Sequence, residues 1–321
     1  MSALGRHQTV HETAIAAPAE VVYGLIADAQ RWPVHFTPTV HLERTELDDR
    51  TERLQIWATA NDSVKSWTSR RVLDPDAFRV EFRQEVSAPP VAAMGGVWTV
   101  RPAGPSASTL VLTHDFEAVD GDSAAVAWIT EATDRNSTAE LARLKRTAEQ
   151  ADRLSELVFS FADSVRVRGG ADLVYTFLRD AGRWPVRLPH VDRLEMREDV
   201  PGIQLMAMDT RAADGSVHTT ESIRICFAPS RIVYKQLVTP ALMTAHIGEW
   251  LVEPGEDEVL VTSRHTVCLN ESAIATVLGP DATTGTAREF IRRAVGGNSA
   301  ATLALAKKFA ETAASIRAGR G

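Results

Sequence analysis

The sequence predicts an α+β protein made of two copies of one helix-grip domain, in which a curved antiparallel sheet wraps around a long C-terminal helix and encloses a pocket. Three observations predict this fold class. A six-residue motif occurs twice, each copy contains a series of short alternating segments, and each copy closes with a long amphipathic segment. An antiparallel sheet followed by one long helix buries its concave face when the helix lies across it.

The duplication is visible as a recurring spacing of about 152 residues, which drifts slightly between motifs and has grown to 162 at the closing "NS" helix. "RWPVHF" begins at Arg31, and "RWPVRL" begins 152 residues later at Arg183. At the same spacing "VVYGLIADAQRWPV" corresponds to "LVYTFLRDAGRWPV", and "MGGVWTVRP" to "HIGEWLVEP". Near the ends, "NSTAELARLKRTAE" matches "NSAATLALAKKFAE". Such self-similarity indicates a repeated structural unit. We therefore expect two domains, residues 1–152 and 153–321, with a short join around residues 150 to 158.

Within each copy, strand and helix signals follow one order. In the first, "TVHETAIAAP" predicts a strand, and Pro18 begins a short helix with apolar residues spaced along one face. The Trp-Pro pair that follows ends this helix. Six alternating segments separated by turn signals then predict six strands: "VHLERTEL", "TERLQIWATA", "SVKSWTSRRVL", "FRVEFRQEV", "GGVWTVRP" and "TLVLTHDFEAV". Residues 124–154 contain no Gly or Pro and predict one long amphipathic helix.

Composition excludes several classes of protein. The 44% hydrophobic and 24% charged residues are ordinary for a soluble globular chain, and no apolar run has the length of a membrane span or of a signal peptide core, so we expect a cytoplasmic protein with no membrane partner. A net charge of −7 and the absence of nucleic-acid-binding motifs argue against a nucleic acid partner.

The sequence also lacks the signatures of bound cofactors. Cys226 and Cys268 have neither metal-ligand spacing nor the density of a disulfide scaffold, and both are interpreted as reduced residues in strands. Gly-rich phosphate loops, zinc-binding spacings and the Gly-x-Ser-x-Gly nucleophile motif are missing as well. We expect no cofactor and no metal site.

One predicted strand carries three residues suited to chemistry. Trp67, Ser69 and Arg71 alternate along "KSWTSRR", so they lie on one face of the strand. A guanidinium that faces a cavity can hold a carbonyl oxygen and stabilise an enolate that develops there. The alternative is that this face is solvated, with Arg71 in water and Trp67 covering an edge.

The second copy keeps only part of this pattern. Ser222 and Arg224 align with the Ser-x-Arg pair, but Thr220 stands in the place of the tryptophan. We therefore expect catalysis mainly in the first copy. A related alternative is a mixed protein, in which one half is catalytic and the other is a structural or docking partner.

One histidine occupies matched positions in the two copies. His114 and His265 stand on predicted strand faces with apolar neighbours. Such an imidazole can shuttle a proton or polarise a carbonyl group. The alternative is a core histidine that is bonded to a backbone carbonyl.

Four tryptophans also recur at matched positions. They are Trp32 and Trp98 in the first copy and Trp184 and Trp250 in the second. Together they suit a pocket for a flat, unsaturated ligand, because indole offers apolar area and one hydrogen-bond donor. The alternative is that each is simply a core residue.

These segments resemble a known family. "RWPVHFTPTVHLERTE", "WTSRRVLDP", "GGVWTVRP" and the closing helix are similar to the polyketide aromatase/cyclases of bacterial type II polyketide synthases, and the duplication resembles their two-domain subclass. The most specific part is the Trp67-x-Ser69-x-Arg71 strand together with Trp32 and Trp98.

The resemblance implies a START-like (Bet v 1-like) fold for each half and a pocket for a poly-β-ketone delivered by an acyl carrier protein. It implies aldol closure of the first ring between the seventh and twelfth carbons, dehydration to the aromatic ring, and Arg71 as the anchor of a carbonyl group. Other type II polyketide synthase subunits are implied as further partners. The aromatic hydroxyl that some one-domain members place after the first tryptophan is replaced here by His35 and Phe36.

The residues fit this reaction. Hydrogens between two carbonyls are already acidic, so the main task of such a pocket is to fold the chain so that the correct carbons meet. Ser69, His114 or bound water are then the candidates for proton transfer. An alternative function is a non-catalytic START-like binding protein for a lipid or polyketide, which predicts a pocket lined almost entirely by apolar groups.

Overall fold

The computed structural model describes residues 5–60, 63–211, 215 and 217–318. The chain divides into two compact units, Met1–Leu154 and Ser155–Gly321. The division falls two residues beyond the boundary expected from the repeat. None of the described helices combines the length and apolar character that crossing a membrane requires.

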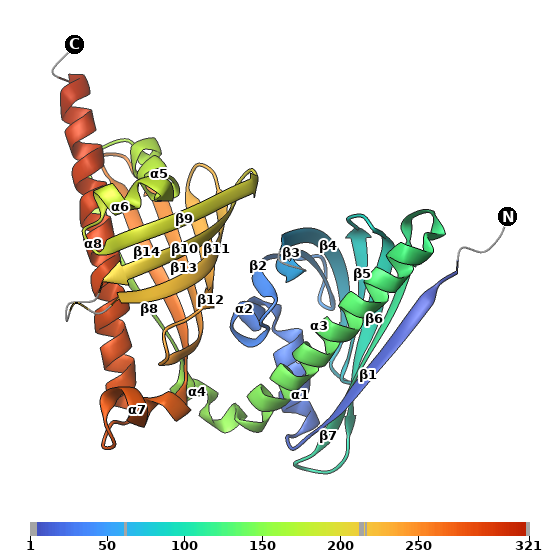
Figure 1. The fold of residues 1–321 in the computed structure, drawn as a ribbon. Helices are drawn as coiled ribbons and strands as arrows, with labels where there is room; N and C mark the ends of the chain where they lie inside the picture. The colour runs from blue at the N-terminus through green and yellow to red at the C-terminus, as the bar shows by residue number, and fades with distance from the viewer. Residues whose placement is uncertain (1–4, 61–62, 212–214, 216, 319–321) are drawn as a thin grey trace. The chain divides into compact units, whose positions relative to one another are not determined.

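The N-terminal unit contains a seven-stranded antiparallel sheet and one long helix (Figure 1). Its elements are β1 (His7–Ile15), α1 (Ala19–Ala27), η1 (Ala29–Arg31), α2 (Trp32–His35), β2 (Thr39–Glu46), β3 (Thr51–Ala60), β4 (Ser63–Asp74), β5 (Arg79–Val86), β6 (Val91–Pro102), β7 (Ser108–Ala118), η2 (Val119–Gly121) and α3 (Ser123–Glu149). The strand order is β1-β7-β6-β5-β4-β3-β2. Helix α3 packs against β1 and β7.

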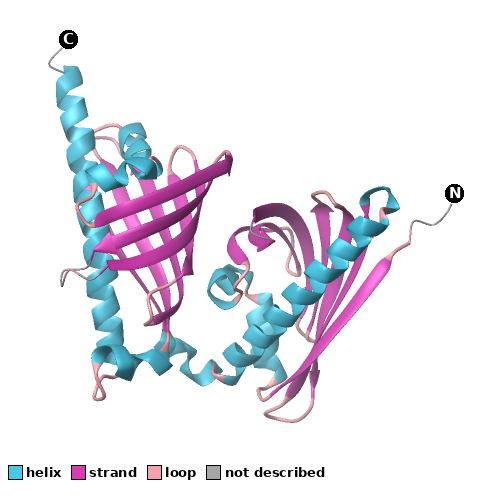
Figure 2. Cartoon of the chain, in the orientation of Figure 1, coloured by secondary structure: helices cyan, strands magenta, loops and turns pink. Residues whose placement is uncertain are grey.

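The C-terminal unit repeats this order of elements and adds one short helix before its long helix. Figure 2 distinguishes its helices from its strands by colour. Its elements are β8 (Val158–Val167), α5 (Ala171–Arg179), η4 (Ala181–Arg183), α6 (Trp184–Arg187), β9 (Val191–Val200), β10 (Ile203–Arg211), β11 (Val217–Phe227), β12 (Arg231–Val238), β13 (Met243–Pro254), β14 (Val259–Leu269), η5 (Glu271–Ala273), α7 (Ile274–Leu278) and α8 (Thr284–Ala318). The strand order is β8-β14-β13-β12-β11-β10-β9, and α8 packs against β8 and β14. The predicted α+β fold with two helix-grip units is confirmed.

Local sequence explains where the helices begin and end. Pro18 precedes α1, and the Asp122 carboxylate accepts hydrogen bonds from the backbone N–H groups of Ala124 and Ala125 at the start of α3, both at 3.2 Å. Such caps satisfy N–H groups that have no partner inside the helix. Helix α3 ends at Glu149, earlier than the sequence predicts. The 3-10 turn η3 (Ala151–Arg153) and the short α4 (Leu154–Leu157) then lead directly into β8.

A glycine allows close packing between the same two strands in both units. In the N-terminal unit the Phe82 ring lies over Gly96, where an added Cβ would come 2.6 Å from the ring and would also meet the Thr113 carbonyl oxygen. In the C-terminal unit Gly248 lies in the same way beneath Tyr234. Glycine is needed here because it has no side chain to occupy this space.

We predict that Gly96→Ala destabilises the protein by about 1–3 kcal/mol, because backbone and ring atoms must move to make room for the new methyl group. Gly24→Ala is the matched control. Gly24 lies inside α1 with open space around it, so this change is expected to stabilise by about 0.5–1 kcal/mol. Chemical denaturation of the two variants checks the prediction, and equal stability of Gly96→Ala and the parent protein would contradict it.

Candidate functional site

A cavity of about 250 Å³ lies inside the N-terminal unit. Aromatic side chains make much of its wall: Trp32, Phe36, Trp67, Phe82, Trp98 and Trp128. Its polar lining residues include Ser69, Arg71, His114, Asn136, Ser137 and Glu140, together with Thr39, Thr59, Lys65, Gln84 and Thr133. All the site residues predicted in the first half therefore line one cavity, and Phe36 joins them.

Strand β4 supplies three of these residues, as alternation predicts. Ser69 is 3% exposed and Arg71 is 1% exposed, so this face of the strand is not solvated. Trp67 is half-buried on the same face. Opposite the sheet, α3 presents Asn136, Ser137 and Glu140, whose spacing places them on neighbouring turns of one helix face.

Arg71 is almost fully engaged within the protein. Its Nε donates to Glu52 Oε1 at 2.8 Å, and its Nη2 donates to the same carboxylate. Nη1 donates to the carbonyl oxygen of Ile26 at 2.9 Å, and Nη2 also donates to that of Ala27 at 2.8 Å. Four of its five N–H groups are thereby used, so at most one N–H is left for a ligand.

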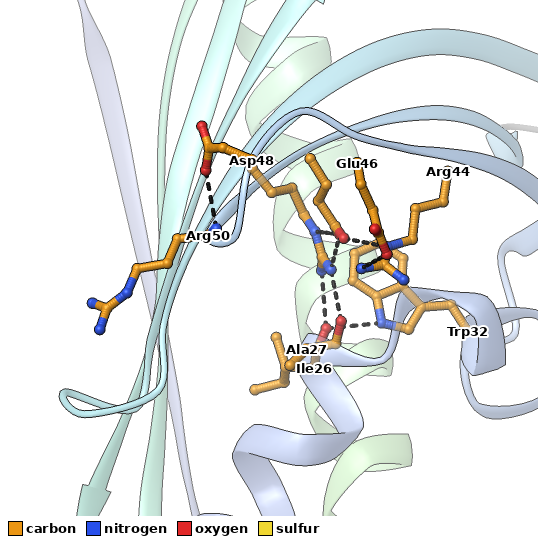
Figure 3. A network of polar contacts seen from close by, with 9 residues as sticks. Ile26, Ala27, Trp32, Arg44, Glu46, Asp48 and Arg50 are labelled. Atoms are coloured by element: carbon orange, nitrogen blue, oxygen red, sulfur yellow. Dashed lines mark hydrogen bonds and ion pairs between the residues drawn. The ribbon is translucent and has the colours of Figure 1, made fainter.

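The same network fixes Trp32. The indole N–H donates to the Ile26 carbonyl oxygen at 3.2 Å, and the Arg71 guanidinium lies over the indole ring, 4.7 Å from its centre. Figure 3 shows Trp32 beside the carbonyl groups of Ile26 and Ala27 at the end of α1. One wall of the cavity is therefore tied to the helix end through a shared acceptor and a cation–π contact.

His114 is a neutral imidazole in the cavity wall. Burial, with a smaller contribution from the nearby His11, lowers its pKa to about 4, so the ring carries no charge at pH 7. The Phe82 ring meets it edge-on at 5.5 Å between ring centres. Its Nδ1 is buried and has no hydrogen-bond partner within the described part of the chain, which differs from the alternative of a core histidine bonded to a carbonyl.

The sequence analysis missed Glu140. This carboxyl group lines the cavity and has no hydrogen bond or ion pair with another described residue, and burial raises its pKa to about 7. The signal was present in the helix periodicity. Thr133, Ser137 and Leu144 are buried on α3, and Glu140 falls on the same stripe, three residues after Ser137 and four before Leu144. A charged residue on an inward stripe is uncommon and marks a candidate functional group.

The C-terminal unit houses its matched arginine differently. Arg224 is 1% exposed and lies over Trp184 at 5.0 Å, and its Nη2 donates to the Leu178 carbonyl oxygen at 2.5 Å. The residue facing it across the β10–β11 pair is Gln204, whereas Glu52 faces Arg71 across the β3–β4 pair. Among the described residues, Arg224 Nε and Gln204 Oε1 have no hydrogen-bond partner.

The remaining residues predicted in the second half lie in the core of that unit. Ser222 and Trp250 are each 5% exposed, and Trp184 is 6% exposed. None of them lines the cavity of the N-terminal unit.

His265 belongs to a buried chain of hydrogen bonds. Gln236 Oε1 lies 2.9 Å from His246 Nδ1, and because an amide oxygen only accepts, His246 Nδ1 donates and its Nε2 accepts. His265 Nδ1 then donates to His246 Nε2 at 3.0 Å. His265 Nε2 is then the acceptor, and the hydroxyl oxygens of Ser299 at 2.8 Å and Ser263 at 3.0 Å share its one lone pair. Burial lowers the pKa of His246 to about 3 and that of His265 to about 4, so both rings are neutral.

The two interiors thus differ in the groups that could take part in a reaction. Counting from the two "NS" motifs, Thr302 stands where Glu140 stands in the first unit, and its hydroxyl donates to the Asn298 carbonyl oxygen. The interior of the second unit contains the chain of hydrogen bonds through His246 and His265. Together, the fold and this cavity define a two-domain helix-grip protein, with one interior cavity described in its N-terminal unit.

Comparison with known proteins identifies the family. Residues 6–149 match the family model described as "Polyketide cyclase / dehydrase and lipid transport". The chain is 46% identical over 308 residues to the granaticin polyketide synthase bifunctional cyclase/dehydratase of Streptomyces violaceoruber, covering 96% of this chain and 95% of that one. It is 46% identical over 313 residues to the actinorhodin polyketide synthase bifunctional cyclase/dehydratase of Streptomyces coelicolor, with coverages of 94% and 96%.

Solved structures agree with this result. The di-domain ARO/CYC BexL from the BE-7585A biosynthetic pathway superposes with a TM-score of 0.85 at 49% identity, covering 95% of this chain and 99% of that chain. The di-domain ARO/CYC StfQ from the steffimycin pathway gives a TM-score of 0.83 at 36% identity, with coverages of 97% and 99%. The chain belongs to the polyketide synthase bifunctional cyclase/dehydratases, a family of two-domain aromatase/cyclase enzymes.

The neutral histidine chain of the second unit predicts a stability that depends on pH. The unfolded histidines take up protons near pH 6.5, whereas the folded ones do so near pH 3 to 4. The contribution of these neutral rings to the free energy of unfolding is therefore fully present above pH 6.5 and is lost as the pH falls toward 4. For one such histidine the loss is on the order of 3 kcal/mol. We expect His246→Met, which introduces the residue found at position 94 of the first unit, to reduce this loss.

Hydrogen exchange of backbone amides in β12 and β13 at pH 4.5, 5.5 and 6.5 measures the effect in the unit concerned. Substitution of the exposed His218 by Gln, which removes a histidine at the surface of the same unit, is the control. A pH dependence that is the same with and without His246 would contradict the assignment of a neutral buried ring.

Proposed function

We propose that the N-terminal cavity binds a poly-β-ketone carried by an acyl carrier protein, closes its first ring between the seventh and twelfth carbons, and promotes loss of water to the aromatic ring. The names of the relatives, which are polyketide synthase cyclase/dehydratases, support this class of reaction. They also support a place beside the other synthase subunits, and we propose that this place is the cytoplasm. The single observation that carries the proposal is Glu140, a carboxyl group of raised pKa inside an aromatic cavity.

Ring closure requires one proton to leave a carbon. The Glu140 carboxylate takes a hydrogen from a carbon between two carbonyls, and the resulting enolate carbon bonds to a distant carbonyl carbon. The electron pair of that carbonyl moves to its oxygen, which takes a proton and becomes a hydroxyl group. Neutral His114 is placed to hydrogen-bond an oxygen of the chain during this step. A group whose pKa lies near the working pH is well suited both to taking the proton from the carbon and to giving a proton to the oxygen.

Loss of water uses the same carboxyl group in both of its protonation states. The carboxylate removes the remaining hydrogen from the carbon next to the new hydroxyl-bearing carbon. The hydroxyl group then leaves as water with a proton from the protonated acid, and a carbon–carbon double bond forms. With a pKa of about 7, Glu140 populates both states at neutral pH. Ser69 and bound water are further candidates for carrying the proton to the leaving oxygen.

The aromatic walls control which carbons meet. Trp67, Trp98 and Trp32 confine a flat chain in a cavity of about 250 Å³, and confinement of reacting groups lowers the barrier by several kcal/mol. Arg71 supports this function chiefly by holding Trp32, with one N–H left to contact a carbonyl oxygen. A non-catalytic binding protein would instead have an almost wholly apolar lining, whereas Glu140, His114 and Ser69 all line this cavity.

The second unit is proposed as a structural or docking partner, with Arg224, Ser222, Trp184, Trp250 and His265 forming its core. The Thr220 position lacks the cavity tryptophan, and Thr302 occupies the position of the carboxyl group. We propose domain limits of residues 1–152 and 153–321, supported by the repeat and by the compact units that the structure shows.

We predict that Glu140→Gln lowers the rate of aromatic product formation by about 100-fold, since the amide can neither take nor give the proton. The pH dependence of the single-turnover rate should show an inflection near pH 7 in the parent enzyme and lose it in the variant. Rates are measured with purified protein and a carrier-bound poly-β-ketone, at equal concentrations of folded protein.

Thr302→Val is the matched control, because it changes the equivalent position of the second unit and should leave both the rate and the inflection in place. Retention of the parental rate and pH profile by Glu140→Gln would refute the assignment of Glu140 as the acid and base.

A further inference from the structure

Glu52 stands at the centre of an ion cluster that extends behind the cavity wall. Its side chain is 2% exposed, and its two oxygens serve two arginines. Oε1 accepts from Arg71, and Oε2 accepts from Arg44 Nε at 2.5 Å. Arg44 Nη2 also lies 3.0 Å from Glu46 Oε1, and both side chains are labelled in Figure 3. Glu52 itself is not among the residues that line the cavity.

The contacts form a continuous path from this cluster to the cavity. Glu52 holds the Nε and Nη2 side of the Arg71 guanidinium, whose other hydrogens hold the carbonyl groups of Ile26 and Ala27. Those carbonyls belong to the last turn of α1, where they lack partners inside the helix, and a cation there is also favoured by the helix dipole. The Ile26 oxygen is shared with the indole N–H of Trp32, which lines the cavity.

The second unit has the same strands and the same arginine but lacks the pair formed by Glu52 and Arg44. Gln204 occupies the register position of Glu52, because each faces the arginine of its unit. Met196 occupies the position of Arg44. Met196 pairs with Met206 in the second unit, and Arg44 pairs with Leu54 in the first. The acid and its second arginine are thus replaced by neutral residues at these two positions, while Glu198 accepts from Gln204 Nε2 at 2.8 Å and from Arg179 Nη2 at 2.6 Å. The arginine over the tryptophan remains, but its contacts to the helix carbonyls become uneven. Arg224 Nη1 lies 3.5 Å from the Arg179 oxygen, and its Nε has no partner among the described residues.

We propose that Glu52, together with Arg44, is a positioning residue of the N-terminal unit that fixes Trp32 through Arg71 and so determines which ring the bound chain closes. This inference rests on the proposed function and deepens it. A carboxylate that accepts from two guanidinium groups holds both in one geometry, because charge-assisted bonds are short and directional. A fixed wall restricts the folds open to a flexible poly-β-ketone, whereas a loose wall admits others and releases wrongly closed products.

The chain itself supplies the test variants. Glu52→Gln removes the carboxylate but leaves the buried Arg71 and the partly exposed Arg44 without it, so this variant alone can fail to fold. The double variant Arg44→Met with Glu52→Gln reproduces the residues that the second unit carries at these two positions, Met196 and Gln204. The reciprocal double variant, Gln204→Glu with Met196→Arg, places the cluster in the second unit and is the matched control.

Two measurements are made on the full chain at equal folded concentration, which thermal melts establish. The first is the ratio of correct first-ring product to shunt products from a carrier-bound poly-β-ketone. The second is the hydrogen-exchange rate of the Trp32 indole N–H by nuclear magnetic resonance, with the signal assigned from Trp32→Phe. We expect the Arg44/Glu52 double variant to lower the product ratio at least fivefold and to speed exchange of the Trp32 indole at least fivefold. The reciprocal variant should change neither quantity.

The other possible results overturn either the inference about Glu52 or the proposed function. An unchanged product ratio in the Arg44/Glu52 variant overturns the inference, whether or not the Trp32 signal changes. A lower ratio with an unchanged Trp32 signal also overturns it, because the path through the indole is then not used. If the parent enzyme forms no ring product at all, the proposed function fails instead, and the Trp32 exchange rate still decides whether Glu52 holds the indole.

Discussion

The buried guanidinium of Arg71 connects the parts of the N-terminal unit that enclose the cavity. A charged group inside a protein is unfavourable unless it is paired and hydrogen-bonded. Arg71 meets that requirement with Glu52 on β3 and with two carbonyl groups at the end of α1, which are 45 and 44 residues away in the chain. The contacts that satisfy the cation therefore also hold the sheet against the helix and fix Trp32 between them. The position of one cavity wall follows from the need to satisfy a single side chain.

The two units show how one frame accommodates two interiors. The strand order, the Ser-x-Arg pair and the glycine beneath an aromatic ring occur in both. The inward-facing side chains at three matched positions differ between the two units. Trp67, Met94 and Glu140 of the first unit correspond to Thr220, His246 and Thr302 of the second. The first set encloses a cavity with a titratable carboxyl group, whereas His246 joins a chain of neutral hydrogen bonds.

Much of the fold could be predicted because its signals are local or periodic. The spacing between the two "RWPV" motifs indicated the duplication, and alternation along β4 placed Trp67, Ser69 and Arg71 on one face. The surroundings of Arg71 could not be predicted, because its partners come from β3 and from backbone carbonyls of α1, and carbonyl groups carry no sequence signal. Glu140 could have been found from the stripe of α3 that faces inward. The different housing of Arg224 depends on Gln204, whose register opposite the arginine is known only once the strands are paired.

The most direct test of this account is the structure of the full chain bound to a stable, non-reacting mimic of a poly-β-ketone linked to a pantetheine arm. The account predicts that the mimic occupies the N-terminal cavity between Trp67 and Trp98, with an oxygen or an enolisable carbon within about 3.5 Å of the Glu140 carboxyl group. It also predicts that the contacts of Arg71 with Glu52, Ile26 and Ala27 are retained. A mimic bound in the second unit, or an Arg71 guanidinium that leaves Glu52 to grip a carbonyl of the ligand, would contradict the account.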